Sequence, residues 1–389
     1  HLQLIDAAIA HISDALKDPE SNGNRENQYQ YILIQYCKPP QNKYNNRLFC
    51  YWNFDANVSQ AKSTVTAIDR DQDVSESDRL LSLCKASADS LRLDIMRVLS
   101  KESFGVLELC RIFDMPQPGM SHHLKLLATA GLVTTKREGN SIFYRRSLPS
   151  SKNTLENLTR SMFDAIDQIA LDSQRRTSVA AVHDDRALSA KQFFDKNAHR
   201  LKENQDLIVE FKHYSGCLQD LLFNEVLATN ANVIEVGPGE SELINLLINK
   251  FERVTAIDTS EEMLLKAQAR LSKEQGKKVE FLLGDLSGIQ SNKSPADLIV
   301  LNMVLHHLPS PQAFFKTAQQ HLSVGGQLLI VDLCSHNQDW AREVCGDLWL
   351  GFEPDELTLW AHEASLKVGQ SVYLGLKNGF QVQLRLFQN

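Results

Sequence analysis

The sequence predicts an α/β protein in which a small α+β domain precedes a larger, doubly wound parallel sheet. Two patterns carry this prediction. An apolar run from Val233 to Val236 is followed by a glycine turn and then by helix-like apolar spacing, which is the strand–turn–helix unit that opens such sheets. Residues 79–148 instead give short helices followed by a hairpin. A length of 389 residues exceeds what one hydrophobic core usually serves and fits this division.

We expect four segments along the chain. Residues 1–78 are predicted to be a weakly ordered extension, because polar and acidic stretches follow one helix-like pattern and one short strand. Residues 79–150 form the first folded domain, residues 151–188 a helix and linker, and residues 189–389 the sheet domain. Because the chain begins with His rather than Met, we expect it to be a fragment or to include translated sequence upstream of the true start.

The first folded domain has the pattern of a winged helix-turn-helix. Amphipathic helices are expected near residues 79–83, 91–99 and 106–113, and a further helix runs from Pro118 to Ala130, where Gly131 ends it. Two strands, 132–136 and 142–146, follow with a Gly-Asn pair between them that suits a tight hairpin. In such domains the second helix of the pair enters the major groove.

This architecture predicts which side chains contact DNA. The candidates for base edges lie on the recognition helix, and the candidates for phosphates are basic residues of that helix and of the wing. Base contacts are expected from Gln117, Ser121 and His122, and phosphate contacts from Lys125, Arg137, Arg145 and Arg146. A winged helix that serves only protein contacts is the alternative, but the basic excess is concentrated here: residues 79–150 carry 11 basic and 6 acidic side chains, against 13 and 19 in residues 232–389.

Three stretches in this block resemble the ArsR family of bacterial repressors: Leu91 to Ile95, Gln117 to Leu127 (QPGMSHHLKLL) and the run from Ala130 into the basic wing. The resemblance covers about seventy residues and implies a transcriptional regulator that binds double-stranded DNA. Many members sense metals through paired cysteines in the helix before the recognition helix. Here that helix has only Cys110, which cannot supply a three-sulfur site, so we expect no metal site.

The segment after the wing carries one apolar stripe with helical spacing. Leu155, Leu158, Met162, Ile166 and Ile169 recur every three or four residues. In the resembling family a helix at this place pairs two subunits, so a homodimer is expected, although a contact within one chain explains the stripe almost as well. Residues 177–188 are polar and predict a linker, and residues 189–227 predict further helices, where Phe194 and Tyr214 are candidates to cover the cleft of the sheet domain.

The glycine turn after Val236 indicates a nucleotide-like ligand that carries positive charge. The following helix opens with Glu240 and Glu242, and no lysine or arginine lies in the turn, so a pyrophosphate would be repelled. The sulfonium and ammonium groups of S-adenosylmethionine tolerate such acids. Nineteen positions after Gly239, a second strand-like run ends on Asp258, where a carboxylate can accept both ribose hydroxyls.

With those motifs, residues 232–389 resemble a class I S-adenosylmethionine-dependent methyltransferase. Further matching stretches are 279–286 (VEFLLGDL), 296–311 and 322–332, although Ser241 stands where the family often has a third glycine. The resemblance implies a Rossmann-like sheet that binds S-adenosylmethionine or S-adenosylhomocysteine. It implies cofactor contacts from Glu235, Gly237, Gly239, Asp258, Thr259, Asp285, Leu286 and Asn302.

A catalytic residue is harder to identify. His306 and His307 follow the fourth strand motif near the expected acceptor position and are weak candidates for a base; Cys334, His336 and Cys345 lack the spacing of a metal site. The tail predicts a helix over 340–351, another from residue 352, and two last antiparallel strands with Asn378-Gly379 between them. Trp349 and Trp360 are candidates to cap an acceptor pocket, but core packing explains them better.

Two functions therefore stay open: a DNA-binding regulator that senses the adenosyl ligand, and a working methyltransferase with a fused regulatory module. No run of eighteen apolar residues and no signal peptide is visible, so no membrane partner is expected. Seven scattered cysteines without paired spacing fit a reducing cytoplasm.

Overall fold

The computed structural model describes residues 75–100, 102–138, 141–147, 154–224, 227–240, 242–289 and 295–389. The helix and strand expected near residues 1–17 and 29–36, the Gly-Asn pair of the hairpin and Ser241 lie outside the described residues. Residues 71–389 belong to one compact unit. The domain boundaries drawn from the sequence stay predictions.

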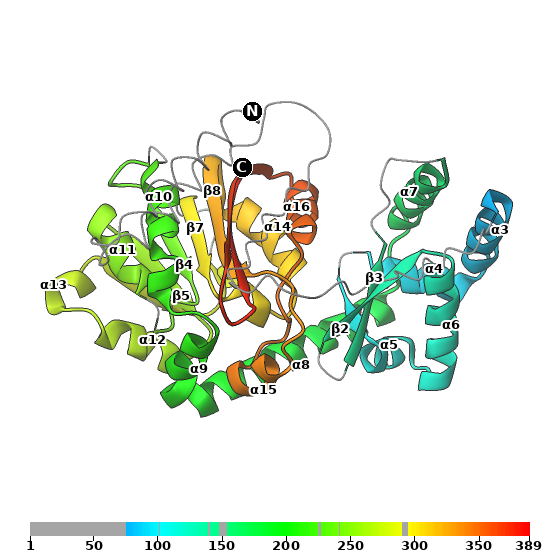
Figure 1. The fold of residues 1–389 in the computed structure, drawn as a ribbon, viewed down its shortest axis with the longest axis horizontal. Helices are drawn as coiled ribbons and strands as arrows, with labels where there is room; N and C mark the ends of the chain where they lie inside the picture. Colours follow the sequence, from blue (N-terminus) through cyan, green and yellow to red (C-terminus); the bar gives the residue numbers. More distant parts are fainter. Residues whose placement is uncertain are drawn as a thin grey trace, which may run out of the picture. The chain divides into compact units, whose positions relative to one another are not determined.

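The helix-turn-helix and its wing follow the order expected from the sequence (Figure 1). The helices are α3 (Glu76–Ser87), α4 (Ser90–Val98), α5 (Val106–Phe113) and α6 (Gln117–Thr129), and the strands are β1 (Phe104–Gly105), β2 (Val133–Glu138) and β3 (Ser141–Arg146). Strand β3 lies between β1 and β2 in an antiparallel sheet. Gly131 follows α6 with a φ of 70°, so the expected helix end is confirmed.

The buried faces of these elements meet in one core. Ile95, Leu109, Met120 and Leu124 are fully buried there. The apolar positions of α6 recur at i, i+4 and i+7, so they point inward and leave the opposite face of the helix to solvent.

Two long helices follow the wing, α7 (Thr154–Asp167) and α8 (Ser173–Asn197). Ile166 of the predicted stripe is buried in the winged helix core, but Leu158 and Ile169 are 42% and 56% exposed. The stretch 177–188, expected to be a linker, is helical and lies within α8. Although the stretch is polar, the helix is held by a few buried positions, of which Val182 packs in the winged helix core and Arg186 is an ion-paired arginine.

The C-terminal half is built on a mixed sheet. In the described residues its strands are β4 (Val233–Val236), β5 (Val254–Asp258), β6 (Val279–Leu283), β7 (Ala296–Asn302), β8 (Leu322–Leu333), β9 (Lys367–Gly375) and β10 (Gln381–Gln388). They are ordered β6-β5-β4-β7-β8-β10-β9. The first five are parallel, and β10 is antiparallel to both β8 and β9. This is a doubly wound, Rossmann-like sheet with a final hairpin, as expected.

Helices cover both faces of this sheet (Figure 1). One core joins alternate strand residues to α10 (Ser215–Asn224), α11 (Leu243–Lys250) and α15 (Trp340–Cys345). The other joins the intervening residues to α14 (Pro311–His321) and α16 (Pro354–Glu363). The remaining helical elements are α9 (Leu201–Ile208), α12 (Glu261–Ala269), α13 (Lys273–Gly276), η1 (Ala198–Arg200), η2 (Phe211–His213), η3 (Leu286–Gly288) and η4 (Leu305–His307). Because the strand order reverses between β4 and β7, a ligand crevice is expected at their carboxyl ends.

One helix prediction in the tail is wrong in length. The helix expected over residues 340–351 ends at Cys345, because Gly346 takes a left-handed conformation with a φ of 78°. A side chain there would come within 2.3 Å of Phe193, so the turn requires glycine. The extended loop that follows runs to Glu353, and α16 begins at Pro354. We call residues 346–352 the bridging loop.

Candidate cofactor cleft and nucleic-acid interface

The turn after β4 has the shape of a ligand cradle. Gly237 and Gly239 both have positive φ, 67° and 47°, which favours glycine. A Cβ atom on Gly237 would lie 2.7 Å from a methyl carbon of Val304. Glycine at this position therefore keeps the backbone close to the end of β7, at the edge of the sheet where the strand order reverses.

Glu235 lies directly before this turn and is buried, with 1% of its surface exposed. Neither carboxylate oxygen has a hydrogen-bond partner within the described residues. Burial without compensation raises the pKa of Glu235 to about 8. A buried carboxylate of this kind is costly unless a cation compensates it. The arrangement fits a positively charged ligand above the glycine turn.

Asp258 ends the neighbouring strand β5 and is held by the backbone. Its carboxylate accepts a hydrogen bond from the amide of Ser260 at 2.9 Å, while Thr259 between them is exposed. Burial raises the pKa of Asp258 to about 6, and the nearby Asp195 adds to this effect. The Ser260 hydroxyl donates to Asp195 of α8 at 2.8 Å. The position at the strand end suits acceptance of ribose hydroxyls.

The other expected cofactor residues occupy different environments. Asp285 is exposed and accepts from the amide of Gly288 at 3.0 Å, so its carboxylate already orders the turn η3. Leu286 in that turn is buried. Asn302 ends β7, is buried, and is hydrogen-bonded to the side chain of Tyr214.

A cleft lies over the carboxyl ends of these strands. Asn302 lines it, as does Tyr214, which the sequence suggested as part of a cover. Its other lining residues include the acidic Asp206, Glu240 and Glu242. They also include Met303, His306 and Cys345. The orphaned carboxylate and the glycine cradle fit S-adenosylmethionine, which when bound would supply an electrophilic methyl group. Phe194 packs instead against His307, Leu201 and Met263.

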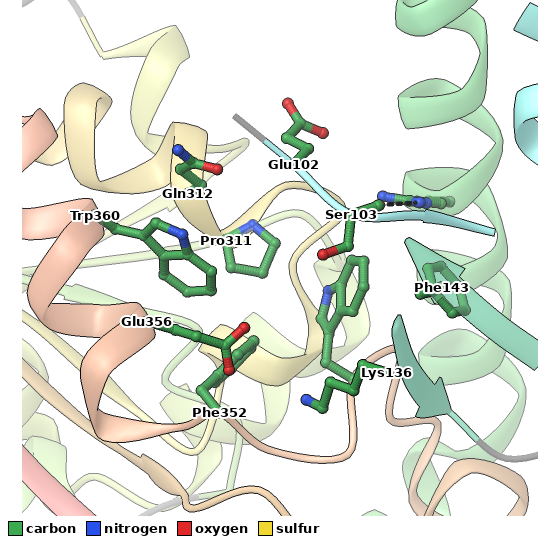
Figure 2. Close-up of a pocket in the computed structure, with 11 residues that line it drawn as sticks. Glu102, Ser103, Lys136, Phe143, Pro311, Gln312, Phe352, Glu356 and Trp360 are labelled. Carbon is green, nitrogen blue, oxygen red and sulfur yellow. Dashed lines mark hydrogen bonds between the residues drawn. The ribbon is translucent and has the colours of Figure 1, made fainter. Parts of the chain in front are cut away.

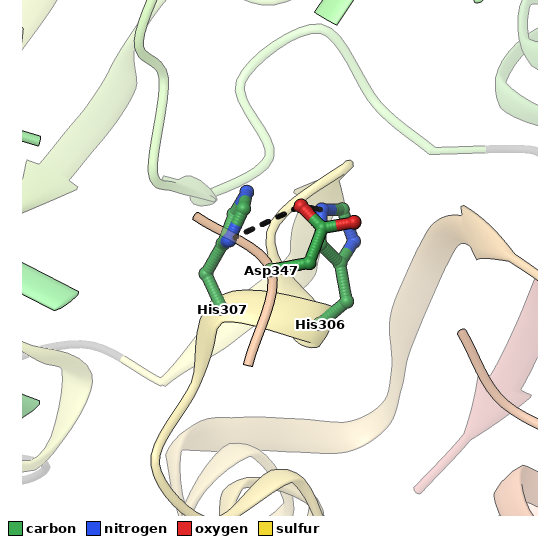
Figure 3. A group of neighbouring side chains, drawn as sticks. All are labelled: His306, His307 and Asp347. Atoms are coloured by element: carbon green, nitrogen blue, oxygen red, sulfur yellow. Dashed lines mark ion pairs between the residues drawn. The ribbon is translucent and has the colours of Figure 1, made fainter. Parts of the chain in front are cut away.

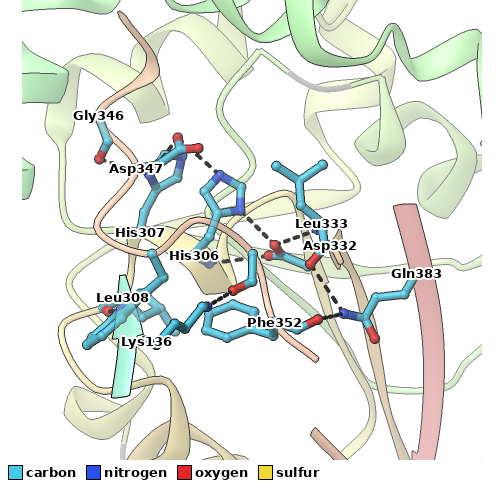
Figure 4. A network of polar contacts seen from close by, with 12 residues as sticks. Lys136, His306, His307, Leu308, Asp332, Leu333, Gly346, Asp347, Phe352 and Gln383 are labelled. Atoms are coloured by element: carbon cyan, nitrogen blue, oxygen red, sulfur yellow. Dashed lines mark hydrogen bonds and ion pairs between the residues drawn. The ribbon is translucent and has the colours of Figure 1, made fainter. Parts of the chain in front are cut away.

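His306 and His307 form a buried polar cluster with two aspartates (Figures 3 and 4). His306 Nδ1 lies 2.8 Å from Asp332 and its Nε2 lies 3.6 Å from Asp347. Burial disfavours the imidazolium of His306, but the two carboxylates outweigh it and raise the pKa to about 9. Burial lowers the pKa of His307. His306 is therefore charged at neutral pH, which is the wrong protonation state for a general base.

The recognition helix presents the expected polar side chains together. Gln117, Ser121 and Lys125 are spaced by four residues and share one face of α6, and His122 lies beside them. Gln117, His122 and Lys125 are exposed, and Ser121 is partly exposed. This geometry is what insertion into a major groove requires, and their contacts with DNA stay predictions.

Unlike the recognition helix, the wing contacts the sheet domain through several of its residues (Figure 2). Arg145 forms an ion pair with Glu356 of α16, whose side chain is only 5% exposed. Lys136 donates to the carbonyl of Gly351 at 2.5 Å. Arg146 makes two hydrogen bonds of 2.7 Å to Asp167 of α7. Arg137 is exposed. The predicted phosphate contacts of Arg145 and Arg146 thus compete with partners inside the chain.

Comparison with known proteins follows the same division of the chain. Residues 88–136 match a family described as Helix-turn-helix domain, and residues 227–367 match one described as Methyltransferase domain. The arsenical resistance operon repressor of Staphylococcus aureus is 34% identical over 79 residues, which cover 20% of this chain and 76% of that protein. The chain belongs to the ArsR-type regulators and carries a fused methyltransferase domain.

Relatives of the methyltransferase half are more distant. An uncharacterized methyltransferase of Bacillus cereus is 28% identical over 151 residues, which cover 38% of this chain and 68% of that protein. The solved N-methyltransferase NodS of Bradyrhizobium japonicum, in complex with S-adenosyl-L-homocysteine, is 17% identical, covers 52% of this chain and 98% of its own, and has a TM-score of 0.41.

Several residues of this ArsR-type fusion were not found from its sequence. Asp332 could have been suspected, because it ends a strand at the same sheet edge as Glu235 and Asp258. Asp347, Lys136 and Glu356 gave no signal, because their importance depends on contacts between distant parts of the chain. Trp349 was expected in the core and is buried, but it packs against Phe143 of the wing.

Proposed function

We propose that this ArsR-type fusion is a DNA-binding transcriptional regulator whose methyltransferase domain binds S-adenosylmethionine or S-adenosylhomocysteine as the sensed ligand. The observation that carries the proposal is the docking of the wing on the sheet domain. Arg145, a candidate for phosphate, is held by Glu356, and Lys136 is held by the bridging loop. A ligand that changes this docking changes the number of cations available to DNA, which is the differential interaction that coupling requires.

The bridging loop reaches from the cluster beside the cleft to the wing. Its Asp347 lies next to the histidine pair. The amides of Leu348 and Trp349 both donate to the His306 carbonyl at 3.1 Å, and Trp349 then packs against Phe143 with ring centroids 5.2 Å apart. A ligand that shifts η4 or the loop therefore acts on a surface that also contacts β3.

Helix α8 supplies a second physical connection. Arg186 in its middle makes two hydrogen bonds, of 2.7 and 2.6 Å, to Glu108 of α5, and donates to the Pro309 carbonyl at 2.9 Å. Near its end, Asp195 accepts from Ser260, two residues after Asp258. One helix thus contacts both the helix-turn-helix and the strand end at which ribose is expected.

The chemistry of the cleft supports a cationic adenosyl ligand. Glu235 lies directly before the glycine turn and is buried, with no hydrogen-bond partner for its carboxylate within the described residues. Glu240 and Glu242 line the cleft and are paired with Lys266 and Lys202. A sulfonium or ammonium group close to Glu235 would favour its charged form. We assign Glu235, Gly237 and Gly239 to the methionine side, Asp258 and Thr259 to the ribose, Asp285 and Leu286 to the adenine, and Asn302 to the floor of the cleft.

Two copies are expected to act together. The exposed Leu158 and Ile169, with Leu80 and Leu81 of α3, give apolar surface beside the winged helix core. A homodimer would present two α6 helices to a palindromic site, one helical turn apart or a multiple of it. Among the described residues, Cys84, Cys110, Cys217, Cys334 and Cys345 are free thiols, which suits the cytoplasm in which we place the protein. Every helix that the structure describes is too short or too polar to cross a bilayer.

Methyl transfer to a small molecule is the second candidate. It is favoured by the position of His306, which lines the cleft and is held by Asp332. Against it stands the charge of His306 at neutral pH, although methyl transfer depends mainly on positioning and does not always need a base. A turnover assay that releases S-adenosylhomocysteine in the presence of a small-molecule library would favour this candidate.

The deciding experiment measures DNA affinity with S-adenosylmethionine, with S-adenosylhomocysteine and with neither, on a duplex selected from random sequence. We expect one ligand to shift the affinity at least fivefold, as is typical of a coupling of 1–3 kcal/mol. Asp258→Ala, which removes hydrogen bonds worth about 1.5–3 kcal/mol each, should abolish both ligand binding and the shift. The exposed Glu280→Ala is the matched control. If calorimetry detects ligand binding but the DNA affinity does not shift, methyl transfer becomes the favoured function.

A further inference from the structure

The histidine pair and Asp347 bring three metal-ligating groups together at one point (Figure 3). His306 and His307 come from η4, and Asp347 comes from the bridging loop. One ligand atom of each lies within 4.8 Å of the others, and all three residues are buried. Asp347 Oδ1 lies 3.6 Å from His306 Nε2 and 3.9 Å from His307 Nδ1. Ligands about 2.1 Å from a tetrahedral ion are roughly 3.4 Å apart, so the two distances from Asp347 are a few tenths of an ångström too long, and the distance between the two histidine nitrogens is at most 4.8 Å.

The surroundings supply what ligands of a metal need. Asp332 lies 2.8 Å from His306 Nδ1 (Figure 4), and this contact orients Nε2 toward Asp347, as outer carboxylates orient metal-binding imidazoles. The carbonyl of Gly346 lies 3.3 Å from His307 Nδ1, so a further oxygen is close to the same point.

Charge favours a divalent ion in the same place. The side chains of Asp332 and Asp347 are both 0% exposed, and two buried carboxylates carry two negative charges. A divalent cation at this point would be attracted by both carboxylates.

We propose that His306, His307 and Asp347 bind one divalent first-row transition-metal ion of the Zn²⁺, Co²⁺, Mn²⁺ or Fe²⁺ class. Two imidazoles and a carboxylate are typical ligands for these ions, whereas thiophilic ions need sulfur. Cys345 is not part of the set, because its thiol contacts the Asn204 carbonyl at 3.5 Å. The site was not expected from the sequence, since Asp347 lies forty residues beyond the histidines.

The ion would join two segments that are distant in the chain. Asp347 belongs to the bridging loop, which also carries Trp349 and Gly351, both in contact with the wing. Binding therefore fixes one end of that loop to η4. The proposal is independent of the adenosyl ligand, because the cluster and the glycine cradle use different residues.

The test uses the full chain, stripped with a chelator and titrated with Co²⁺, whose visible absorption reports on its ligands. We expect one equivalent of Co²⁺ with d–d bands and no thiolate charge-transfer band, and displacement by Zn²⁺. Asp347→Asn and His307→Gln should each weaken binding more than tenfold, and Asp332→Asn, which removes an outer partner, by about 10–100-fold. His362→Gln, at an exposed position of α16, should bind as the wild type does.

Binding that persists in Asp347→Asn, or that shows a thiolate band, would overturn the proposal, because the ion would then lie elsewhere. Failure of the wild-type chain to retain any Co²⁺ would also overturn it and leave a protonated His306 between its two carboxylates. Circular dichroism of each variant checks that it folds, and the wild-type titration tests the proposal even where a variant does not.

Discussion

The arginines of the wing and the carboxyl group of Glu235 beside the cofactor cleft are satisfied in different ways. In the wing, Arg145 is paired with Glu356, and Arg146 with Asp167. In the cleft, Glu235 is buried and neither of its oxygens has a hydrogen-bond partner within the described residues. The wing already has protein partners that DNA must displace, whereas Glu235 is a buried carboxyl group that burial keeps protonated up to about pH 8 and whose charged form a bound cation would favour. The first arrangement suits a switch and the second a ligand site.

The largest expected effect is that of replacing Glu235, whose carboxyl group has no hydrogen-bond partner within the described residues. Because burial raises the pKa of Glu235 from 4.5 to about 8, the folded chain holds one proton more than the unfolded chain between these values. The free energy of unfolding therefore falls as the pH rises through this window. Glu235→Gln, which does not ionise, should remove that loss. Its stability should equal that of the wild type near pH 4 and exceed it near pH 9, by an amount on the order of several kcal/mol.

Denaturant unfolding at several pH values measures this difference, and Glu280→Gln on exposed β6 is the control. If the stability curves of Glu235→Gln and the wild type run parallel, Glu235 has a compensating partner and the cleft does not differ from the wing.

The next largest effect on stability is expected from breaking the ion pair between Arg186 and Glu108. Arg186 is 8% exposed in its side chain and pairs with Glu108, whose side chain is 21% exposed. Arg186→Ala removes the ionic partner of that carboxylate, which keeps only the amide of Gly105 as a donor among the residues that the structure describes, at a cost of about 3 kcal/mol. The loss should appear first in the helix-turn-helix, as faster amide exchange in α5 by mass spectrometry. Arg176→Ala, at an exposed position of the same helix, should change stability by less than about 0.5 kcal/mol. Equal effects of both variants would show that the buried pair does not hold α8 to the winged helix.

A smaller effect is expected where α6 meets DNA, on the surface that the sheet domain leaves exposed. Ser121→Ala and His122→Ala should each reduce discrimination between a selected duplex and a scrambled one by about 1–3 kcal/mol, because base contacts carry specificity. Lys125→Ala should weaken binding to both duplexes by the same factor, since phosphate contacts carry no sequence information. Fluorescence anisotropy at one salt concentration gives the ratio of the two dissociation constants. If Ser121→Ala and His122→Ala leave this ratio unchanged, these two side chains do not read the bases.

The contrast between wing and cleft also explains what the sequence could predict. Short-range patterns predicted the elements that depend on local spacing: α5 at Val106–Phe113, α6 with Gly131 after it, and β5 with Asp258 at its end. Strand ends and glycine turns also brought Glu235, Gly237 and Asp258 to one edge, because parallel strands share that edge.

Contacts between distant segments could not be predicted in this way. The polar stretch 177–188 suggested a linker, but its helix is held by Val182 and Arg186, whose partners lie on other elements. Basic composition suggested that Arg145 and Arg146 meet DNA, and composition carries no information on the carboxylates that pair with them. Asp347 joined the histidines only because Gly346 ends α15 early.

The smallest expected effect tests the competition at the wing directly. Glu356→Gln keeps an oxygen that can accept from the amide of Glu353, as Glu356 does at 2.8 Å, but removes the charge that holds Arg145. DNA affinity should rise by about 1 kcal/mol at low salt, roughly fivefold, and the dependence of log K on log salt should steepen by about 0.9, because one more phosphate is neutralised. Adding Arg145→Ala should reverse both changes. Arg137→Ala should lower the salt slope in either background, since Arg137 is exposed on the opposite strand of the wing. An unchanged slope in Glu356→Gln would mean that Arg145 stays on the sheet domain when DNA binds, and the wing would then be a structural contact in which only Arg137 meets the duplex.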